Sequence, residues 1–138
     1  MDRISPDRRS ANMSRIRHKD TTPELVVRRI VHRLGYRYRL HRNDLPGKPD
    51  IAFGPRKKLI FVHGCFWHQH SDCRAGRIPS ANAGYWRAKL ERNVQRDADN
   101  LRVLQAAGWE ILILWECQVA ELAAVEERLV AFLSMDLL

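Results

Sequence analysis

The sequence predicts an α/β fold in which a mixed central sheet has helices on both faces. Apolar residues recur at helical intervals in three segments, and four other segments show the shorter patterns of strands. These segments follow one another in the order α-β-β-β-α-β-α, which favours packing of helices in layers against one sheet. With 138 residues, the chain is long enough for one domain with its own core. We therefore expect a single domain over residues 1–138, with a three-layer α/β/α architecture.

The first predicted helix begins beside Thr22. Either Thr22 is the N-cap with Pro23 at the first helical position, or Thr21 closes a capping box onto Glu24. An apolar stripe then continues until a glycine ends the helix. The preceding segment, residues 5–19, is rich in arginine and only weakly helical in its pattern. We expect that segment to become ordered on a binding partner.

Three strands are predicted to follow this helix. Residues 36–41 alternate tyrosine and leucine with basic residues, which is the pattern of a half-buried strand. Residues 50–53 and 58–63 are short apolar runs, and the four residues between them, Gly-Pro-Arg-Lys, are typical of a turn. The third strand therefore leads directly into a polar loop that begins at Gly64.

Beyond that loop the pattern predicts a long helix, one strand and a final helix. Residues 83–107 carry apolar side chains at helical intervals, and the helix is expected to end at Gly108. Residues 109–115 are an almost continuous apolar run, which is typical of a buried strand. Residues 119–133 have the pattern of an amphipathic helix with an acidic outer face.

The charge of the chain is strongly basic and unevenly distributed. The formal net charge is +8, and the isoelectric point is near 10.0. Up to Arg42 there are twelve Lys or Arg residues and four acidic residues, whereas after Gly108 Arg128 faces six acidic residues. The first part of the chain is therefore suited to binding a polyanion, and nucleic acid is the favoured partner. No pattern predicts a transmembrane segment or a signal peptide.

Residues 61–73 read FVHGCFWHQHSDC and hold three of the six histidines and two of the three cysteines. Cys65, His70 and Cys73 have the spacing C-x4-H-x2-C, and Cys117 is the remaining cysteine. Three thiolates and one imidazole would make a closed tetrahedral zinc site that needs no disulfide. Such a set suits a reducing compartment. The alternative is that Cys117 is an ordinary buried cysteine at the end of an apolar run.

An ordered series of short motifs gives the chain a specific resemblance. Pro49-Asp50 at the start of one strand and Phe61-Val62-His63 in the next resemble the PD-(D/E)xK nuclease arrangement, with histidine in place of lysine. The whole series is similar to the very-short-patch-repair (Vsr-type) DNA mismatch endonucleases. Its members are Asn12 to Ile16, Asp20-Thr21-x-x-Glu24, Leu45 to Asp50, His63 to His68, Tyr85-Trp86, Asn93-Val94-x-Arg96-Asp97, and Gly108-Trp109 through Trp115-Glu116-Cys117.

The resemblance implies a restriction-endonuclease-like fold and a set of site residues. It places the metal-binding aspartate at Asp50, the catalytic histidines at His63 and His68, and a further catalytic glutamate at Glu24. It implies that the residue at position 62 binds magnesium through its backbone carbonyl. Some relatives have threonine there, but Val62 has the same carbonyl. The implied structural zinc ligands are Cys65, His70, Cys73 and Cys117.

Elementary chemistry agrees with these roles. Phosphodiester hydrolysis needs charge neutralisation at the phosphate, a deprotonated water and protonation of the leaving 3′ oxygen. Asp50 offers oxygen ligands that suit Mg²⁺. His68 is expected to deprotonate the attacking water, and His63 to contact the phosphate or a water. Glu24 is expected to orient His68 or the water. For Glu24 and Asp50 the structural alternatives are a capping carboxylate and a solvated turn residue.

Three aromatic residues are candidates for contact with DNA bases. Phe66 and Trp67 stand between presumed metal ligands in a loop, where a hydrophobic core is hard to reach. Trp86 is on a helix and, taken alone, would be an ordinary core residue. Apolar wedges between base steps are an established way to open a duplex. The resemblance implies that all three stack into DNA beside a mismatch and that Met13 enters from the other groove.

The sequence thus predicts a magnesium-dependent endonuclease with a structural zinc that nicks one strand of double-stranded DNA at T·G mismatches left by deamination of 5-methylcytosine. The alternatives are a nuclease of relaxed or different specificity and a DNA-binding module that has lost catalysis. We expect a cytoplasmic, nucleoid-associated monomer that does not act at membranes. The flanking recognition sequence, the associated methyltransferase and any need for accessory repair proteins stay open.

Overall fold

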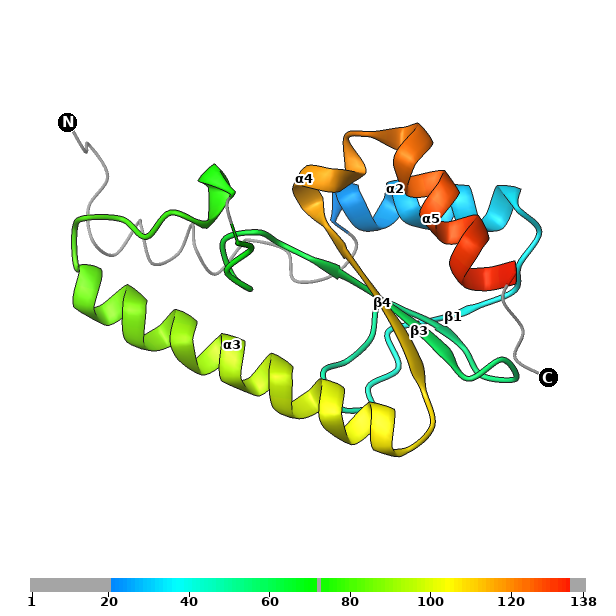
Figure 1. Cartoon of the computed structure of the whole chain (residues 1–138), viewed down its shortest axis with the longest axis horizontal. Helices are drawn as coiled ribbons and strands as arrows, with labels where there is room; N and C mark the ends of the chain where they lie inside the picture. Colours follow the sequence, from blue (N-terminus) through cyan, green and yellow to red (C-terminus); the bar gives the residue numbers. More distant parts are fainter. Residues whose placement is uncertain (1–20, 72, 135–138) are drawn as a thin grey trace.

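The computed structural model describes residues 21–71 and 73–134, which form a four-stranded sheet with helices on both sides (Figure 1). The prediction of a mixed α/β fold is confirmed. The basic segment 5–19, including Met13, lies outside the described residues. The elements are α2 (Thr22–Arg33), β1 (Arg39–Leu40), β2 (Ile51–Phe53), β3 (Lys58–His63), the short 3₁₀ helix η1 (Arg74–Gly76), α3 (Ala83–Ala106), β4 (Glu110–Trp115), α4 (Glu116–Val119) and α5 (Leu122–Ser134).

The sheet has the strand order β1-β2-β3-β4 and mixes two kinds of pairing. β1 with β2 and β2 with β3 are antiparallel, as short connections require, whereas β3 and β4 are parallel and are joined by a long crossover through α3. In the parallel pair, Val62 is opposite Leu114 and His63 is opposite Trp115. Both strands therefore end at the same edge of the sheet.

Helix α2 begins as one of the two predicted alternatives. Thr21 is the N-cap, and its side-chain oxygen accepts a hydrogen bond of 3.4 Å from the backbone N–H of Glu24. Pro23 lies in the first turn, where its missing N–H costs no helical hydrogen bond. This start places the carboxylate of Glu24 against the sheet edge, where the residue is only 2% exposed.

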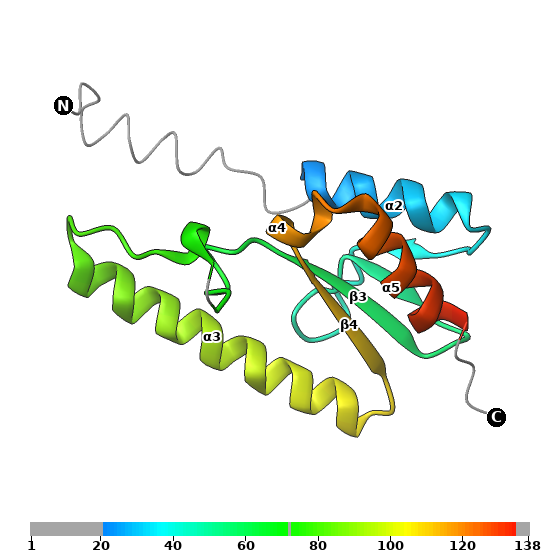
Figure 2. The ribbon, with the colours of Figure 1, turned by 45° about the horizontal axis from the view of Figure 1, so that its top comes forward.

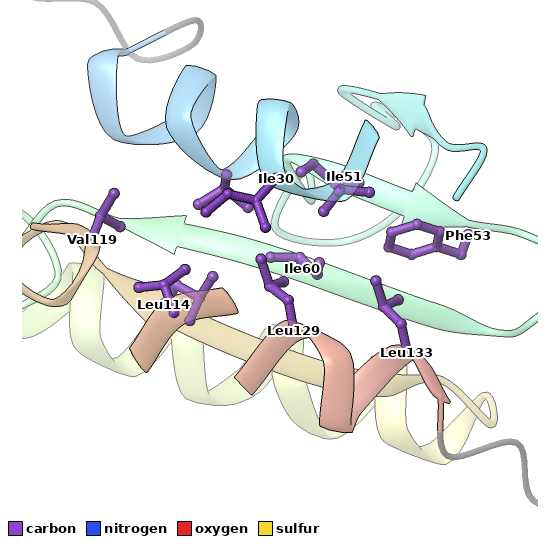
Figure 3. Close-up of a cluster of buried hydrophobic side chains, with 11 residues drawn as sticks. Ile30, Ile51, Phe53, Ile60, Leu114, Val119, Leu129 and Leu133 are labelled. Carbon is purple, nitrogen blue, oxygen red and sulfur yellow. The ribbon is translucent and has the colours of Figure 1, made fainter. Parts of the chain in front are cut away.

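The larger core lies between one face of the sheet and helices α2 and α5 (Figure 3). Ile30 from α2 and Leu129 from α5 meet Ile51, Ile60 and Leu114 from three neighbouring strands. These strand residues alternate with others that face the opposite side, as the two-residue period of a strand requires. Burial of this face fixes the register of the sheet, because a shift of one residue would turn every side chain to the wrong side.

The opposite face of the sheet is covered by the C-terminal part of α3. Leu59 and Phe61 of β3 pack with Leu104 and Trp109. The N-terminal part of α3 extends past the sheet and lies beside the loop that follows β3 (Figures 1 and 2). The helix thus serves two purposes, since one half completes the core and the other half supports the loop. Asn93 links α3 to the loop by donating a hydrogen bond of 3.2 Å to the carbonyl of Trp67.

Two predicted elements differ in the structure. The strand expected over 36–41 is paired only at Arg39–Leu40, because β2 ends at Phe53 and offers no partner further on; Tyr36 and Tyr38 contact the Phe53 ring edge-on. The helix expected over 119–133 begins later, as α5 (Leu122–Ser134), and Val119 is instead the last residue of the separate short helix α4. None of the helices in residues 21–71 and 73–134 has the length and apolar character that crossing a bilayer requires.

Candidate active site and metal centre

Parallel pairing brings two distant segments together at one edge of the sheet. The loop that follows β3 and the start of α4, which follows β4, lie side by side because His63 is opposite Trp115. The backbone N–H of Cys65 donates a hydrogen bond of 3.0 Å to Oε1 of Glu116. All of the candidate site residues that the structure describes lie in or beside this edge.

The four predicted zinc ligands form one cluster. Each of Cys65, His70, Cys73 and Cys117 offers a ligand atom, and these atoms all lie within 4.8 Å of one another. Nδ1 of His70 lies 3.8 Å from Sγ of Cys65 and 3.4 Å from Sγ of Cys117. In a tetrahedral zinc site, sulfur and nitrogen ligands lie about 3.6 Å apart. The donor set and its spacing therefore fit Zn²⁺.

The charges of the clustered thiolates would also be stabilised by a cation. Burial raises the pKa of the Cys65 thiol to about 12, whereas a hydrogen bond with the His70 side chain lowers the pKa of Cys73 to about 7. Thiolates so close together repel one another unless a metal ion compensates for their charge. The alternative reading of Cys117 as an ordinary buried cysteine is wrong, because this residue is exposed.

A second group consists of Glu24, His41 and Asp50, whose ligand atoms also lie within 4.8 Å of one another. Oδ2 of Asp50 accepts a hydrogen bond of 2.6 Å from the backbone N–H of Val62. The N–H of Val62 is available for this bond because the pairing of β2 with β3 begins at Ile51 and Ile60 and does not extend to Val62. Gly47, which has a φ of +78° and lies close to Phe61 and Asn100, allows the turn that leads into Asp50.

The pKa of Asp50 is raised to about 8, mainly by burial and also by the neighbouring Glu24, against the lowering effect of the hydrogen bond from Val62. Two carboxylates in a site of low polarity have a raised pKa because their negative charges repel each other. A divalent cation beside both would remove that repulsion. The oxygen donors and the shielded position fit Mg²⁺.

His63 and His68 form the third group, together with Asp97 of α3. The two imidazole rings are stacked, with centroids 3.8 Å apart and planes inclined by 8°. Nδ1 of His68 lies 2.6 Å from Oδ2 of Asp97. A carboxylate accepts at that distance, so Nδ1 carries the proton and Nε2 of His68 presents its lone pair. The contact with Asp97 therefore leaves Nε2 of His68 as the acceptor atom of this ring.

His63 is the more buried of the two histidines, with 7% of its surface exposed. The pKa of His63 is lowered to about 4, mainly by burial and also by the neighbouring His68. The neutral ring can stack on His68 without charge repulsion when His68 takes up a proton. Its Nδ1 is buried and has no hydrogen-bond partner within the described part of the chain. Trp115 separates this pair from the cysteines, since its ring contacts His63 edge-on and stacks on His70.

The aromatic residues predicted to contact DNA also come together. Phe66, Trp67 and Trp86 have ring centroids 5.0, 5.6 and 6.0 Å apart, and all three are half-buried. None belongs to either hydrophobic core cluster of the described residues. The ammonium group of Lys89 lies over the rings of both tryptophans. The reading of Trp86 as an ordinary core residue is therefore wrong.

Comparison with known proteins identifies the family. The family model of the DNA mismatch endonuclease Vsr matches residues 1–75, which is more than half of the chain. The chain belongs to the Vsr family. It is 48% identical to the type II nicking enzyme V.XorIIP of Xanthomonas oryzae pv. oryzae, over 93% of both chains. It is 38% identical to V.NmeAIP of Neisseria meningitidis serogroup A, over 93% of this chain and 91% of that one.

The same identity, 38%, relates the chain to the DNA mismatch endonuclease Vsr of Escherichia coli K12, over 79% of this chain and 69% of that one. The sequence-based predictions of the Vsr family and of a strand-nicking DNA endonuclease are therefore confirmed. DNA is the substrate class of this family, as the basic first part of the chain indicated.

The structure also shows which site residues sequence reasoning missed. Asp97, and not Glu24, contacts His68, while Glu24 lies with Asp50. Asp97 belongs to a motif shared with the Vsr family, but its role was not predicted. The signal was its position on α3, since Trp86, Asn93 and Asp97 recur at helical intervals and so share one face. Residues 64–70 form a compact loop above that face, which sequence alone does not reveal.

Proposed function

We propose that this member of the Vsr family is a magnesium-dependent endonuclease that nicks one strand at T·G mismatches arising from deamination of 5-methylcytosine. The observation that carries the proposal is the junction of three groups at one sheet edge. The backbone N–H of Val62 donates a hydrogen bond to Asp50, and the next residue of β3 is His63. The ring of His63 stacks on His68. His68 in turn lies beside the aromatic cluster of Phe66, Trp67 and Trp86. We further propose a single restriction-endonuclease-like domain over residues 1–138.

Asp50, Glu24 and the backbone carbonyl of Val62 would hold the magnesium ion. The chemistry that Mg²⁺ supplies at such a site is neutralisation of the charge on the scissile phosphate. Asp50 is preorganised for this role by the hydrogen bond from Val62, and Glu24 by its place in the first turn of α2. The zinc ion is proposed as structural, since four protein ligands leave no open position for a substrate.

The histidine pair carries the proton transfer in this proposal. His68 accepts a proton from the attacking water through Nε2, and Asp97 holds the ring and stabilises the imidazolium that forms. His63 stays neutral because it is buried, and it can donate a hydrogen bond to the phosphate. Asp97 is a positioning residue, because it acts through His68 and does not contact the reacting atoms.

Replacing Asp97 by asparagine is expected to lower kcat for nicking by about 10²-fold while KM for DNA changes little, because base catalysis contributes about 10²–10⁴-fold and only its orientation is lost. Single-turnover nicking with saturating enzyme measures the effect. Asp99→Asn is the matched control, since Asp99 lies two residues along α3, is 51% exposed at its side chain and pairs with Arg102. Equal losses in both variants would remove Asp97 from the site.

Mismatch selection is proposed to come from the aromatic cluster. Inserting rings into a base step costs a few kcal/mol of unstacking, and the cost is lower where pairing is already imperfect. The cluster is half-exposed and rigidly supported, because Gln69 donates hydrogen bonds to the carbonyls of Phe66 and Gly76 and Asn93 donates one to Trp67. Side chains that are already held in place lose less conformational entropy when they enter DNA.

The wild-type protein is expected to nick T·G duplexes faster than T·A duplexes with identical flanks at fixed salt. Trp67→Ala and Trp86→Ala should each lower this ratio by about tenfold, since stacking of one base on an aromatic ring contributes about 1–3 kcal/mol. Val103→Ala, which truncates an exposed apolar residue at the far end of α3, is the control. Equal nicking of both duplexes by the wild type would refute the repair assignment and leave a nuclease of broader specificity.

A further inference from the structure

Arg28 places a guanidinium group inside the Glu24–His41–Asp50 group. Its Nη2 lies 3.1 Å from Oε2 of Glu24 and 3.0 Å from Nε2 of His41. The side chain of Arg28 is 13% exposed and that of Glu24 is 3% exposed, so this contact is shielded from water. One nitrogen atom thus bridges a carboxylate from the first turn of α2 and an imidazole from the segment that follows β1.

The contact with Arg28 determines the tautomer of His41. A guanidinium has donors only, so Nε2 of His41 must accept, and its lone pair points at Arg28. In this tautomer it is the only ring lone pair that His41 could offer to a metal ion. The backbone also holds His41 in place, since it has a φ of +50° and its N–H donates a hydrogen bond of 3.3 Å to the carbonyl of Asp50.

Two carboxylates and one imidazole are a poor ligand set for keeping Mg²⁺. Nitrogen ligands favour transition metals, whose affinities exceed those of Mg²⁺ at almost any mixed site, whereas Mg²⁺ prefers oxygen ligands and retains its waters. The ligand atoms of Glu24, His41 and Asp50 already lie within 4.8 Å of one another. If His41 took part, the proposed magnesium site would bind Mn²⁺, Fe²⁺ or Zn²⁺ in preference.

We propose that Arg28 is a metal-selectivity residue, which keeps His41 and one oxygen of Glu24 away from the ion at Asp50. The guanidinium occupies the lone pair of His41 and adds a positive charge beside the site. Transition metals lose their nitrogen ligand, and the ion is held through oxygen atoms. This role rests on the proposed magnesium site at Asp50. It explains how His41 can lie beside that site without becoming a ligand.

Mn²⁺ is the probe that tests this role, since its electron paramagnetic resonance signal distinguishes free from bound ions and its preference for oxygen and nitrogen keeps it out of a zinc-loaded thiolate site. Arg28→Met, which removes the charge and preserves much of the length, is expected to bind Mn²⁺ at least about tenfold more tightly than the wild type. Pulsed spectra should show coupling to a nitrogen nucleus in this variant that the wild type lacks. Adding His41→Gln should remove this coupling and lower the affinity again, although the part of the gain that comes from the lost positive charge remains.

Several results would overturn the proposal. Nitrogen coupling in the wild type that disappears in His41→Gln would show that His41 is already a ligand, since His63 and His68 could also give a nitrogen signal. His41→Gln alone keeps an acceptor for Arg28, so a loss of Mn²⁺ affinity in this variant would point to the same conclusion. Weaker or equal binding by Arg28→Met would mean that Arg28 only supports Glu24.

An Asp50→Asn variant tests the proposed metal site separately from the proposed role of Arg28. If this variant binds Mn²⁺ as the wild type does, the proposed metal site is wrong, and the role of Arg28 is wrong with it. If Asp50→Asn removes binding while Arg28→Met changes neither affinity nor nitrogen coupling, the metal site stands and only the selectivity role is refuted.

Discussion

Asp50→Asn is expected to lower the rate of nicking by about 10³-fold or more while DNA affinity stays within about twofold of the wild type. The amide keeps the size of the side chain but loses the negative charge that holds a divalent cation, and this cation supplies several kcal/mol of transition-state stabilisation. Affinity for the duplex comes from basic side chains and aromatic contacts that the variant retains. Binding and cutting should therefore separate.

The measurement is single-turnover nicking of a T·G duplex with Mg²⁺, beside a binding titration of the same duplex without divalent ions. Asp44→Asn provides a matched control, because Asp44 belongs to the same connecting segment, is 62% exposed at its side chain and pairs with Arg42. A variant at Asp50 that kept more than about a tenth of the wild-type rate would contradict the metal role.

Cys117→Ser is expected to remove the bound zinc and to lower Tm by about 10 °C or more, with nicking lost as a consequence. Cys117 is exposed, so without a metal its replacement by serine would cost no more than about 0.5 kcal/mol. With zinc bound, the same change breaks a link between α4 and the loop after β3, and metal-binding free energy is folding free energy. Cys73→Ser should act in the same way.

Zinc content by elemental analysis and thermal unfolding test this result together. Ser71→Ala, at an exposed position of the same loop, should leave both at wild-type values. Soluble, active wild-type protein without zinc would end the assignment. A Cys117→Ser variant that kept its zinc and its Tm would instead limit the site to the three ligands of the loop.

The sequence by itself determined the elements whose signals are local. The helix start at Thr21 or Thr22, the strand over 58–63 and the long helix from residue 83 follow from side-chain preferences and from the periodicities of neighbouring residues. Three of the four presumed zinc ligands lie within nine residues, from Cys65 to Cys73, and could be grouped from spacing alone. The ordered motifs supplied the Vsr family, since each carries its information along the chain.

Tertiary structure decided what depends on contacts between distant segments. Cys117 joins the cluster because β3 and β4 pair in parallel and end at one edge. Asp97 meets His68 because α3 extends past the sheet and lies under the loop, and Arg28 meets His41 because α2 packs beside β2. β1 is short because its partner β2 ends at Phe53. Such pairings arise from packing of whole faces, so no local pattern of residues could specify them.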